Sequence, residues 1–106
     1  PVLDAPIAMI DARTLQDERL VASRLLYQPP AAEGETYEVA WSPSHRWHYL
    51  SGMMPDEAIL LKCWGNDGGA RTPHTGFVDD AYVGKPVQPT QSIEVRALVF
   101  HVGDTQ

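Results

Sequence analysis

The chain has 106 residues, 43% of them hydrophobic and 21% charged, which indicates one globular domain and excludes a disordered segment. The formal net charge is −6 and the sequence pI is about 5.0, so a nucleic-acid partner is not expected, because phosphate binding requires a basic surface. Acidic and basic residues are scattered along the chain, which favours a role in solubility over a charged interaction tail.

The single cysteine and the absence of long apolar runs bear on the compartment. Cys63 alone excludes an internal disulfide framework and a zinc site built from several cysteines. No apolar run approaches the roughly 18 residues of a membrane span, and the first residues carry no signal-peptide pattern. We therefore expect a cytoplasmic protein without a membrane partner. Pro1 as the first residue is compatible with a natural start and with an excised fragment.

In the first half of the chain, short apolar or alternating runs predict strands. Residues 7–10 form an apolar run typical of a buried strand, and residues 14–18 carry a helix-start or turn signal. Residues 20–27 fit a short helix or a strand and end at two prolines. Residues 35–41 alternate, which predicts a half-buried strand whose apolar face carries Tyr37, Val39 and Trp41.

The second half repeats this pattern of strands and turns. Residues 47–50 and 58–64 are interpreted as strands, and the glycine-rich residues 65–69 predict a tight turn between apolar runs. Residues 92–102 alternate most regularly and are the clearest predicted strand. Together with turns or loops at 55–57 and 83–89, these runs predict a mainly β fold, part of a sandwich or barrel.

Three polar residues lie where they can serve a metal or an acid. His74 follows a turn and suits a metal ligand at a strand end, although a surface loop histidine is the plainer alternative. Arg96 lies inside an apolar strand, where its planar fork suits a carboxylate; a pair with Glu94 or an exposed sheet edge would also explain it. Arg71, three residues before His74, can meet a second acid or simply belong to the loop.

Other polar residues have simpler interpretations. His45 and His48 are three apart, but in a strand such residues face opposite ways, which disfavours a shared metal. Cys63 lies in an apolar run and is expected to be a buried structural thiol and not a nucleophile. Asp79 and Asp80 are expected in a solvated loop.

Six segments, in order along nearly the whole chain, resemble one family. They are residues 6–14 (PIAMIDART), 34–37 (GETY), 44–49 (SHRWHY), 54–64 (MPDEAILLKCW), 71–77 (RTPHTGF) and 92–100 (SIEVRALVF). They resemble the hydroxylase/desaturase group of secondary metabolism, which includes fungal natural-product oxygenases, relatives of gibberellin-type desaturases and the cephamycin C-7 methoxylation component.

The resemblance implies a double-stranded β-helix fold, jelly-roll or cupin-like, of which residues 1–106 are a single domain or fragment, the C-terminal half. It implies a dioxygenase that depends on Fe(II) and 2-oxoglutarate and that hydroxylates or desaturates a small-molecule secondary metabolite. By the same resemblance, His74 is the distal iron ligand and Arg96 binds the distal carboxylate of 2-oxoglutarate. Arg71 is the second candidate for that carboxylate.

One part of such a site is missing from this sequence. Members of the family are more than twice as long and carry a His-x-Asp pair in their N-terminal half, whereas none of the four histidines here is followed two positions later by an acid. We therefore expect a partner, the N-terminal half of the same enzyme as a separate chain or fragment. A non-catalytic β-module that binds through exposed sheet edges remains an alternative. So does a hydrolase using Cys63 or a serine, although no Gly-x-Ser-x-Gly elbow supports it.

Overall fold

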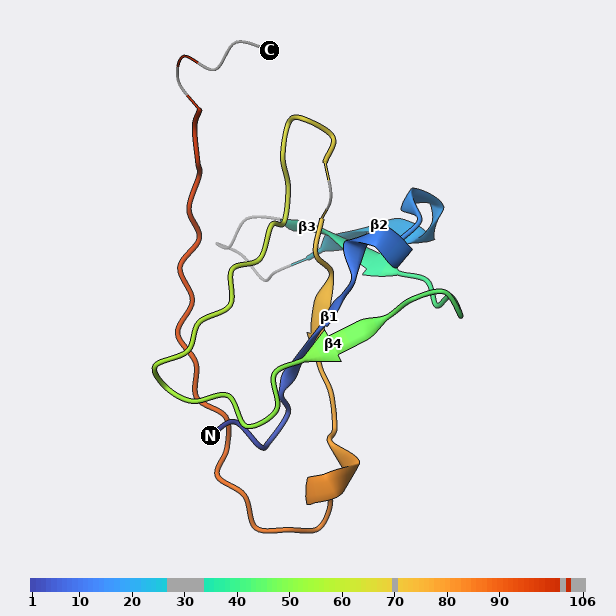
Figure 1. Ribbon diagram of the computed structural model, residues 1–106. Helices are drawn as coiled ribbons and strands as arrows, with labels where there is room; N and C mark the ends of the chain where they lie inside the picture. The colour runs from blue at the N-terminus through green and yellow to red at the C-terminus, as the bar shows by residue number, and fades with distance from the viewer. Residues whose placement is uncertain (27–33, 70, 102, 104–106) are drawn as a thin grey trace.

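The fold was analysed in a computed structural model that describes residues 1–26, 34–69, 71–101 and 103. Its regular elements, in chain order, are five short strands and three single turns of 3-10 helix (Figure 1): β1 (Ile7–Ile10), η1 (Ala12–Thr14), η2 (Asp17–Arg19), β2 (Leu20–Leu25), β3 (Gly34–Val39), β4 (Trp47–Tyr49), β5 (His74–Gly76) and η3 (Asp80–Tyr82). All strand pairs are antiparallel, and no α-helix occurs in the described ranges. The expected mainly β fold is therefore confirmed.

Strand β1 is the centre of a three-stranded sheet with the order β4-β1-β5. Ala8 is in register with Tyr49 on β4 and with Thr75 on β5, and Met9 is in register with both His48 and His74. Because directly opposed residues point to the same side of a sheet, these two rows lie on opposite faces. The strands predicted at residues 7–10 and 47–50 are confirmed, with the second ending at Tyr49.

The face that carries Ala8 is the packed one. Ala8 and Ile10 are the buried hydrophobic residues of the described chain, with 7% and 2% of their surfaces exposed. On the same face Tyr49 meets Phe77 edge to face, with ring centroids 4.8 Å apart, a favoured arrangement of aromatic pairs. The opposite face, with Met9, remains more open. The core is small, and it lies on one side of β1.

A separate hairpin joins β2 to β3 in register from Leu20 opposite Val39 to Leu25 opposite Gly34. The ambiguity over residues 20–27 is thus resolved in favour of a strand as far as Leu25; Tyr27 lies outside the described residues. The predicted apolar face of residues 35–41 is wrong in part. Tyr37 and Trp41 are 53% and 76% exposed, because no second layer covers this hairpin within the described chain.

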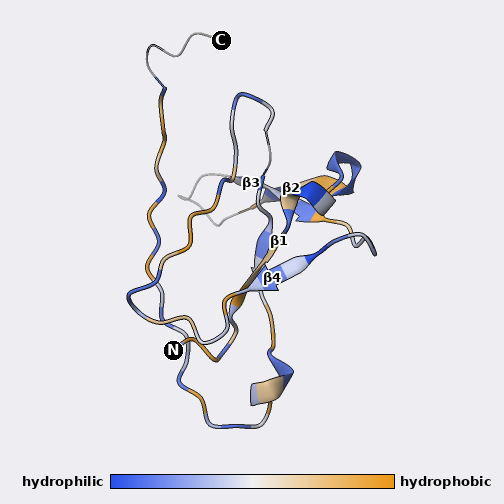
Figure 2. Cartoon of the chain, viewed as in Figure 1, coloured by the Kyte–Doolittle hydropathy of each residue, from blue (hydrophilic) through white to orange (hydrophobic). Residues whose placement is uncertain are grey.

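Two predicted strands are absent. Residues 58–64 and residues 92–101 form no ladder with any described strand, and Figure 1 draws both as long coils. Their apolar side chains are left in solvent: Leu60 is 97% exposed and Ile93 is 94% exposed. Figure 2 shows these apolar stretches in orange along both runs. Within the described chain, residues 58–64 accept a single backbone hydrogen bond, from the Thr72 N–H to the Lys62 carbonyl at 2.8 Å. A strand needs a continuous ladder of such bonds, which the described residues do not supply for either run.

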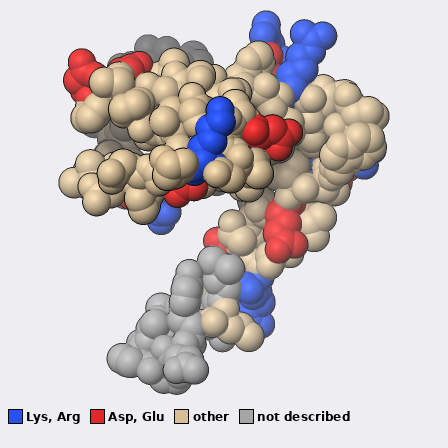
Figure 3. Space-filling model, turned by 90° about the horizontal axis from the view of Figure 1, so that it is seen from below, with Lys and Arg blue, Asp and Glu red and all other residues tan. Residues whose placement is uncertain are grey.

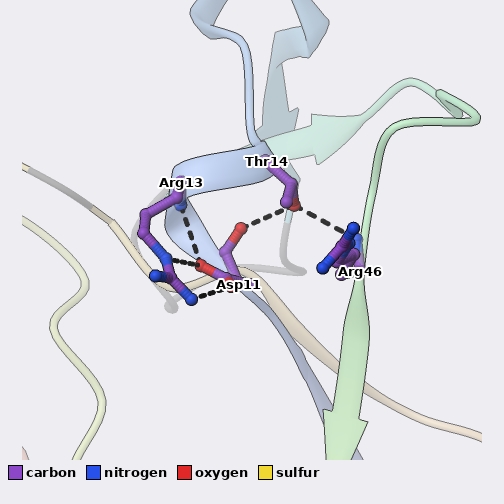
Figure 4. Close-up of polar contacts among 4 residues, drawn as sticks. All are labelled: Asp11, Arg13, Thr14 and Arg46. Atoms are coloured by element: carbon purple, nitrogen blue, oxygen red, sulfur yellow. Dashed lines mark hydrogen bonds and ion pairs between the residues drawn. The ribbon is translucent and has the colours of Figure 1, made fainter.

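The 3-10 turn after β1 is held by a compact polar cluster (Figure 4). The Asp11 carboxylate accepts hydrogen bonds from the Arg13 backbone at 3.1 Å and from its guanidinium at 2.7 and 3.0 Å. Thr14 donates its hydroxyl to the Asp11 carbonyl and accepts from the backbone N–H of Arg46. The cluster therefore ties η1 to the residue that precedes β4. The helix-start or turn signal expected at residues 14–18 corresponds to η2, which begins at Asp17.

The Asp11 cluster predicts a pH dependence of stability. The pKa of Asp11 is lowered from 3.8 to about 2, first by the Arg13 side chain, then by the Arg13 backbone N–H, with a smaller contribution from His48. A carboxyl group with a lowered pKa stabilises the fold above its unfolded pKa, and this contribution is lost as the pH falls toward 2. NMR titration of the Asp11 side-chain carbonyl should give a midpoint near 2 in the wild type. Arg13→Gln removes the main cause of the lowered pKa and should raise the midpoint. A midpoint near 4 in the wild type, the value of a free carboxyl, or the same midpoint in the wild type and Arg13→Gln, would contradict the arrangement.

Candidate metal and co-substrate site

His74 is the first residue of β5, as expected for a histidine at a strand end. Its side chain is exposed, and its Nδ1 lies 2.9 Å from the carbonyl oxygen of Thr72. If Nδ1 carries the proton and donates to this carbonyl, Nε2 keeps its lone pair and points away from that contact. In most metal-binding histidines, a hydrogen bond made by the ring nitrogen that does not bind the metal fixes the tautomer and the orientation of the ring. His74 is therefore prepared locally to donate one ligand atom.

The sheet places a second histidine on the same face. Met9 on β1 is opposed by His48 on β4 and by His74 on β5, so the three side chains form one row across the sheet. The sequence pattern indicated only that His45 and His48 do not share a metal. It could not find the row, because the two histidines are 26 positions apart and only the strand order brings them to one face.

Arg71 contacts the hairpin. Its guanidinium carbon lies 5.1 Å from the centre of the Tyr37 ring on β3, within the range of a cation–π contact. The preceding turn is fixed by Asp67, which accepts from the Gly69 N–H at 2.9 Å and pairs with Lys62 at 3.3 Å. The backbone N–H of Gly69 and then Lys62 lower the pKa of Asp67. The turn expected at residues 65–69 is present and carries Arg71 to the hairpin.

This contact predicts an energetic coupling between Arg71 and Tyr37. In a double-mutant cycle of Arg71→Leu and Tyr37→Leu, we expect a coupling energy of about 0.5–1 kcal/mol in the free energy of unfolding, the usual size of an exposed cation–π contact. Urea unfolding of the four proteins measures it. Additive effects of the two substitutions would mean that the contact contributes nothing to stability.

Arg96 is exposed and lies in the unpaired run 92–101. Neither the alternative pair with Glu94 nor any other ion pair of Arg96 occurs among the described residues. The described chain does not bring Arg96 and His74 into one hydrogen-bonded group. It lies in an apolar alternating run whose side chains are exposed, with Val95 beside it 87% exposed.

The remaining candidates divide clearly. Cys63 is exposed, so the expectation of a buried thiol is wrong; its segment has no covering strand in the described chain. Asp79 caps η3 by accepting from the Ala81 N–H at 3.0 Å, which agrees with the expected loop position. Within the described ranges, no group of three or more His, Cys, Asp or Glu side chains could hold a metal. His74 fits an iron site as one ligand, and the described residues do not complete it.

The surface charge is mixed. Figure 3 shows Lys and Arg dispersed among Asp and Glu on the face that it presents, without a broad basic area. This distribution agrees with the scattered acidic and basic residues of the sequence. In the part of the chain that the structure describes, no helix has the length and apolar character needed to cross a membrane.

The antiparallel strands define a β-rich domain, and its class comes from a comparison with known families. A family model described as "Oxidoreductase/YMDC permease-like domain" matches residues 1–100, and the chain belongs to this family.

Several fungal proteins are similar to this chain over most of its length. The chain is 36% identical over 121 residues to the hydroxylase/desaturase asaB of Aspergillus flavus, covering 94% of this chain and 50% of that protein. It is 36% identical to the hydroxylase/desaturase efuI of Hormonema carpetanum, covering 90% and 35%. It is 31% identical to nvfI of Aspergillus novofumigatus, named an Fe(II)/2-oxoglutarate-dependent dioxygenase, covering 94% and 36%. The expected resemblance to the hydroxylase/desaturase group is confirmed, and the chain spans half or less of these relatives.

Proposed function

We propose that this chain is the C-terminal part of an Fe(II)/2-oxoglutarate-dependent dioxygenase that hydroxylates or desaturates a small-molecule secondary metabolite. The observation that carries the proposal is the state of His74, an exposed imidazole at the start of β5 whose Nδ1 is engaged by the Thr72 carbonyl. This arrangement leaves Nε2 as the metal-binding atom. The names of the related proteins supply the identity of the metal and the co-substrate.

Iron and 2-oxoglutarate, when bound, would supply the oxidising chemistry, in which O2 is the oxidant for both the decarboxylation of the co-substrate to succinate and the oxidation of a C–H bond. The residues of this chain bind and orient. His74 holds the metal through Nε2, and Arg96 neutralises the distal carboxylate of 2-oxoglutarate through a two-point contact. Arg71 is the second candidate for that carboxylate, and would have to leave the Tyr37 ring to reach it.

The other protein ligands come from outside this chain in the proposal. A 2-His-1-carboxylate site needs one more histidine and one acid, and no such group occurs among the described residues. We propose that an N-terminal part, corresponding to the portion of the relatives that this chain does not span, supplies a His-x-Asp pair. The outer edge of β5 has no partner in the described chain and is the natural place for the strand that carries this pair.

The unpaired runs support the same partner. The apolar run 58–64 and the alternating run 92–100 both expose apolar side chains, among them Leu60, Ile93 and Val95. Further strands would bury this surface and convert both runs into the strands that their sequences predict. We also propose a cytoplasmic location, with which a single free cysteine is compatible.

The test uses the natural protein in its full length, including whatever precedes residue 1. Anaerobically purified protein is loaded with Fe(II), given 2-oxoglutarate and oxygen, and assayed for succinate. We expect succinate formation that depends on iron and 2-oxoglutarate. A full-length protein that binds iron but converts no 2-oxoglutarate to succinate, with or without an extract of the producing cells as a source of substrate, would contradict the proposed function. A stable protein that binds neither would instead favour a non-catalytic β-module.

A further inference from the structure

The open face of the β4-β1-β5 sheet carries a row of three side chains, of which the proposed chemistry uses only the histidine on β5. His48 and His74 flank Met9, and the strand spacing of about 4.8 Å puts the backbones of the two histidines about 10 Å apart. Both imidazoles are exposed, and Met9 between them is half-buried. The buried residues Ala8 and Ile10 lie on the other face, so the row faces open space rather than the packed core.

The strand pairing limits where a ligand at His74 can extend. One long edge of β5 is paired with β1, and the other is free in the described chain. Protein ligands that complete the metal site must come from outside the described residues, and the free edge is open to them. The side toward β1 and β4 is then left for a small molecule, which meets Met9 first and His48 next.

The chemistry of His48 suits a carboxylate. Its imidazole is exposed, and its charge interaction on this face is with Asp11, whose pKa it helps to lower. An exposed imidazole N–H can donate to an acid. The neighbouring charge on this face is Asp11, whose carboxylate is already held by the Arg13 guanidinium at 2.7 and 3.0 Å. Because Arg13 already neutralises the Asp11 carboxylate, this carboxylate repels an anion next to His48 less than an unpaired one would.

We propose that His48 is a second binding residue for the co-substrate, donating a hydrogen bond to the distal carboxylate of 2-oxoglutarate while Met9 packs against its methylene groups. This inference rests on the proposed function. It assigns to the β4 strand a share of the binding that the resemblance assigns to Arg96, with Arg71 as the second candidate. His48 acts by positioning the co-substrate and not by holding the metal.

The test measures binding and not turnover. Full-length protein loaded with Mn(II) in place of iron is titrated calorimetrically with 2-oxoglutarate and with 2-oxobutyrate, which lacks the distal carboxylate. We expect His48→Phe to weaken 2-oxoglutarate binding about 10-fold, the usual effect of losing one hydrogen bond to a charged group. Binding of 2-oxobutyrate should change less than about 2-fold, and the metal stoichiometry should stay the same, because no distal carboxylate or metal contact has been removed.

Two further variants keep the result interpretable. Tyr49→Phe changes the next residue on the same strand, which faces the opposite side of the sheet, and should leave both affinities unchanged. His48→Gln keeps a hydrogen-bond donor and should retain part of the affinity for 2-oxoglutarate. It replaces His48→Phe in the test if that variant folds poorly. Equal loss for both ligands, or no loss for either, would overturn the role of His48. Failure of the wild-type protein to bind metal or 2-oxoglutarate would instead remove the proposed function itself.

Discussion

Substitution of His74 by alanine should abolish iron binding by the full-length protein. His74 is the one residue of this chain that we assign to the metal, and its Nδ1 is fixed by the Thr72 carbonyl at 2.9 Å. Losing an outer-shell partner of a metal ligand costs about 10–100-fold in affinity, so losing the ligand itself should cost on the order of 100-fold or more. Titration of Fe(II) into anaerobic apo-protein, read by calorimetry and by metal analysis after desalting, measures the loss.

A matched histidine control comes from the same chain. His45 lies before β4, outside the row of His48, Met9 and His74, and His45→Ala should bind iron as the wild type does. Circular dichroism shows whether each variant remains folded. Equal iron affinity in the wild type and in folded His74→Ala would exclude His74 as a ligand and leave it as the surface histidine that the sequence also allowed.

Removal of Arg96 should raise the dissociation constant of 2-oxoglutarate. Arg96 is exposed in this chain, and we expect the proposed N-terminal part to bury its pair with the carboxylate. Truncating one partner of a buried charge pair costs about 2–5 kcal/mol, so Arg96→Ala should weaken binding on the order of 100-fold. Arg96→Lys keeps the charge but loses the planar fork, and should fall between the wild type and Arg96→Ala. Calorimetric titration of Mn(II)-loaded protein with 2-oxoglutarate gives the three dissociation constants.

Arg71 provides the comparison for Arg96. Arg71 already rests on the Tyr37 ring, so Arg71→Gln should change the affinity for 2-oxoglutarate far less than Arg96→Ala does. The reverse order of the two effects would transfer the carboxylate contact to Arg71. Equal iron binding by all variants is required, since a loss of metal would lower the affinity for the co-substrate indirectly.

The elements that were predicted correctly are those whose partners lie within the described chain. The apolar run at residues 7–10 became β1 because β4 and β5 pair with its two edges. The regular alternation at residues 92–101 predicted a strand equally well, yet this run has no described partner and remains unpaired. Local pattern states which residues prefer an extended conformation, and the ladder itself depends on a second segment.

In the candidate site, too, local features could be predicted from the sequence and features that depend on strand pairing could not. The strand-end position of His74 could be predicted because Pro73, directly before it, is a local signal. The alignment of His48 with His74 could not, because it depends on both strands choosing β1 as their neighbour. The exposure of Cys63 was missed because an apolar sequence predicts burial only when another layer is present to cover it.

The iron stoichiometry of this chain by itself, compared with that of the full-length protein, tests the central claim most directly. Residues 1–106 and the full-length protein are each loaded with Fe(II) under anaerobic conditions, desalted and analysed for metal. If this chain supplies one ligand and the preceding part supplies the other two, the full-length protein should retain about one iron and residues 1–106 essentially none. Full retention of iron by residues 1–106, or none by a folded full-length protein, would contradict a site shared between the two parts.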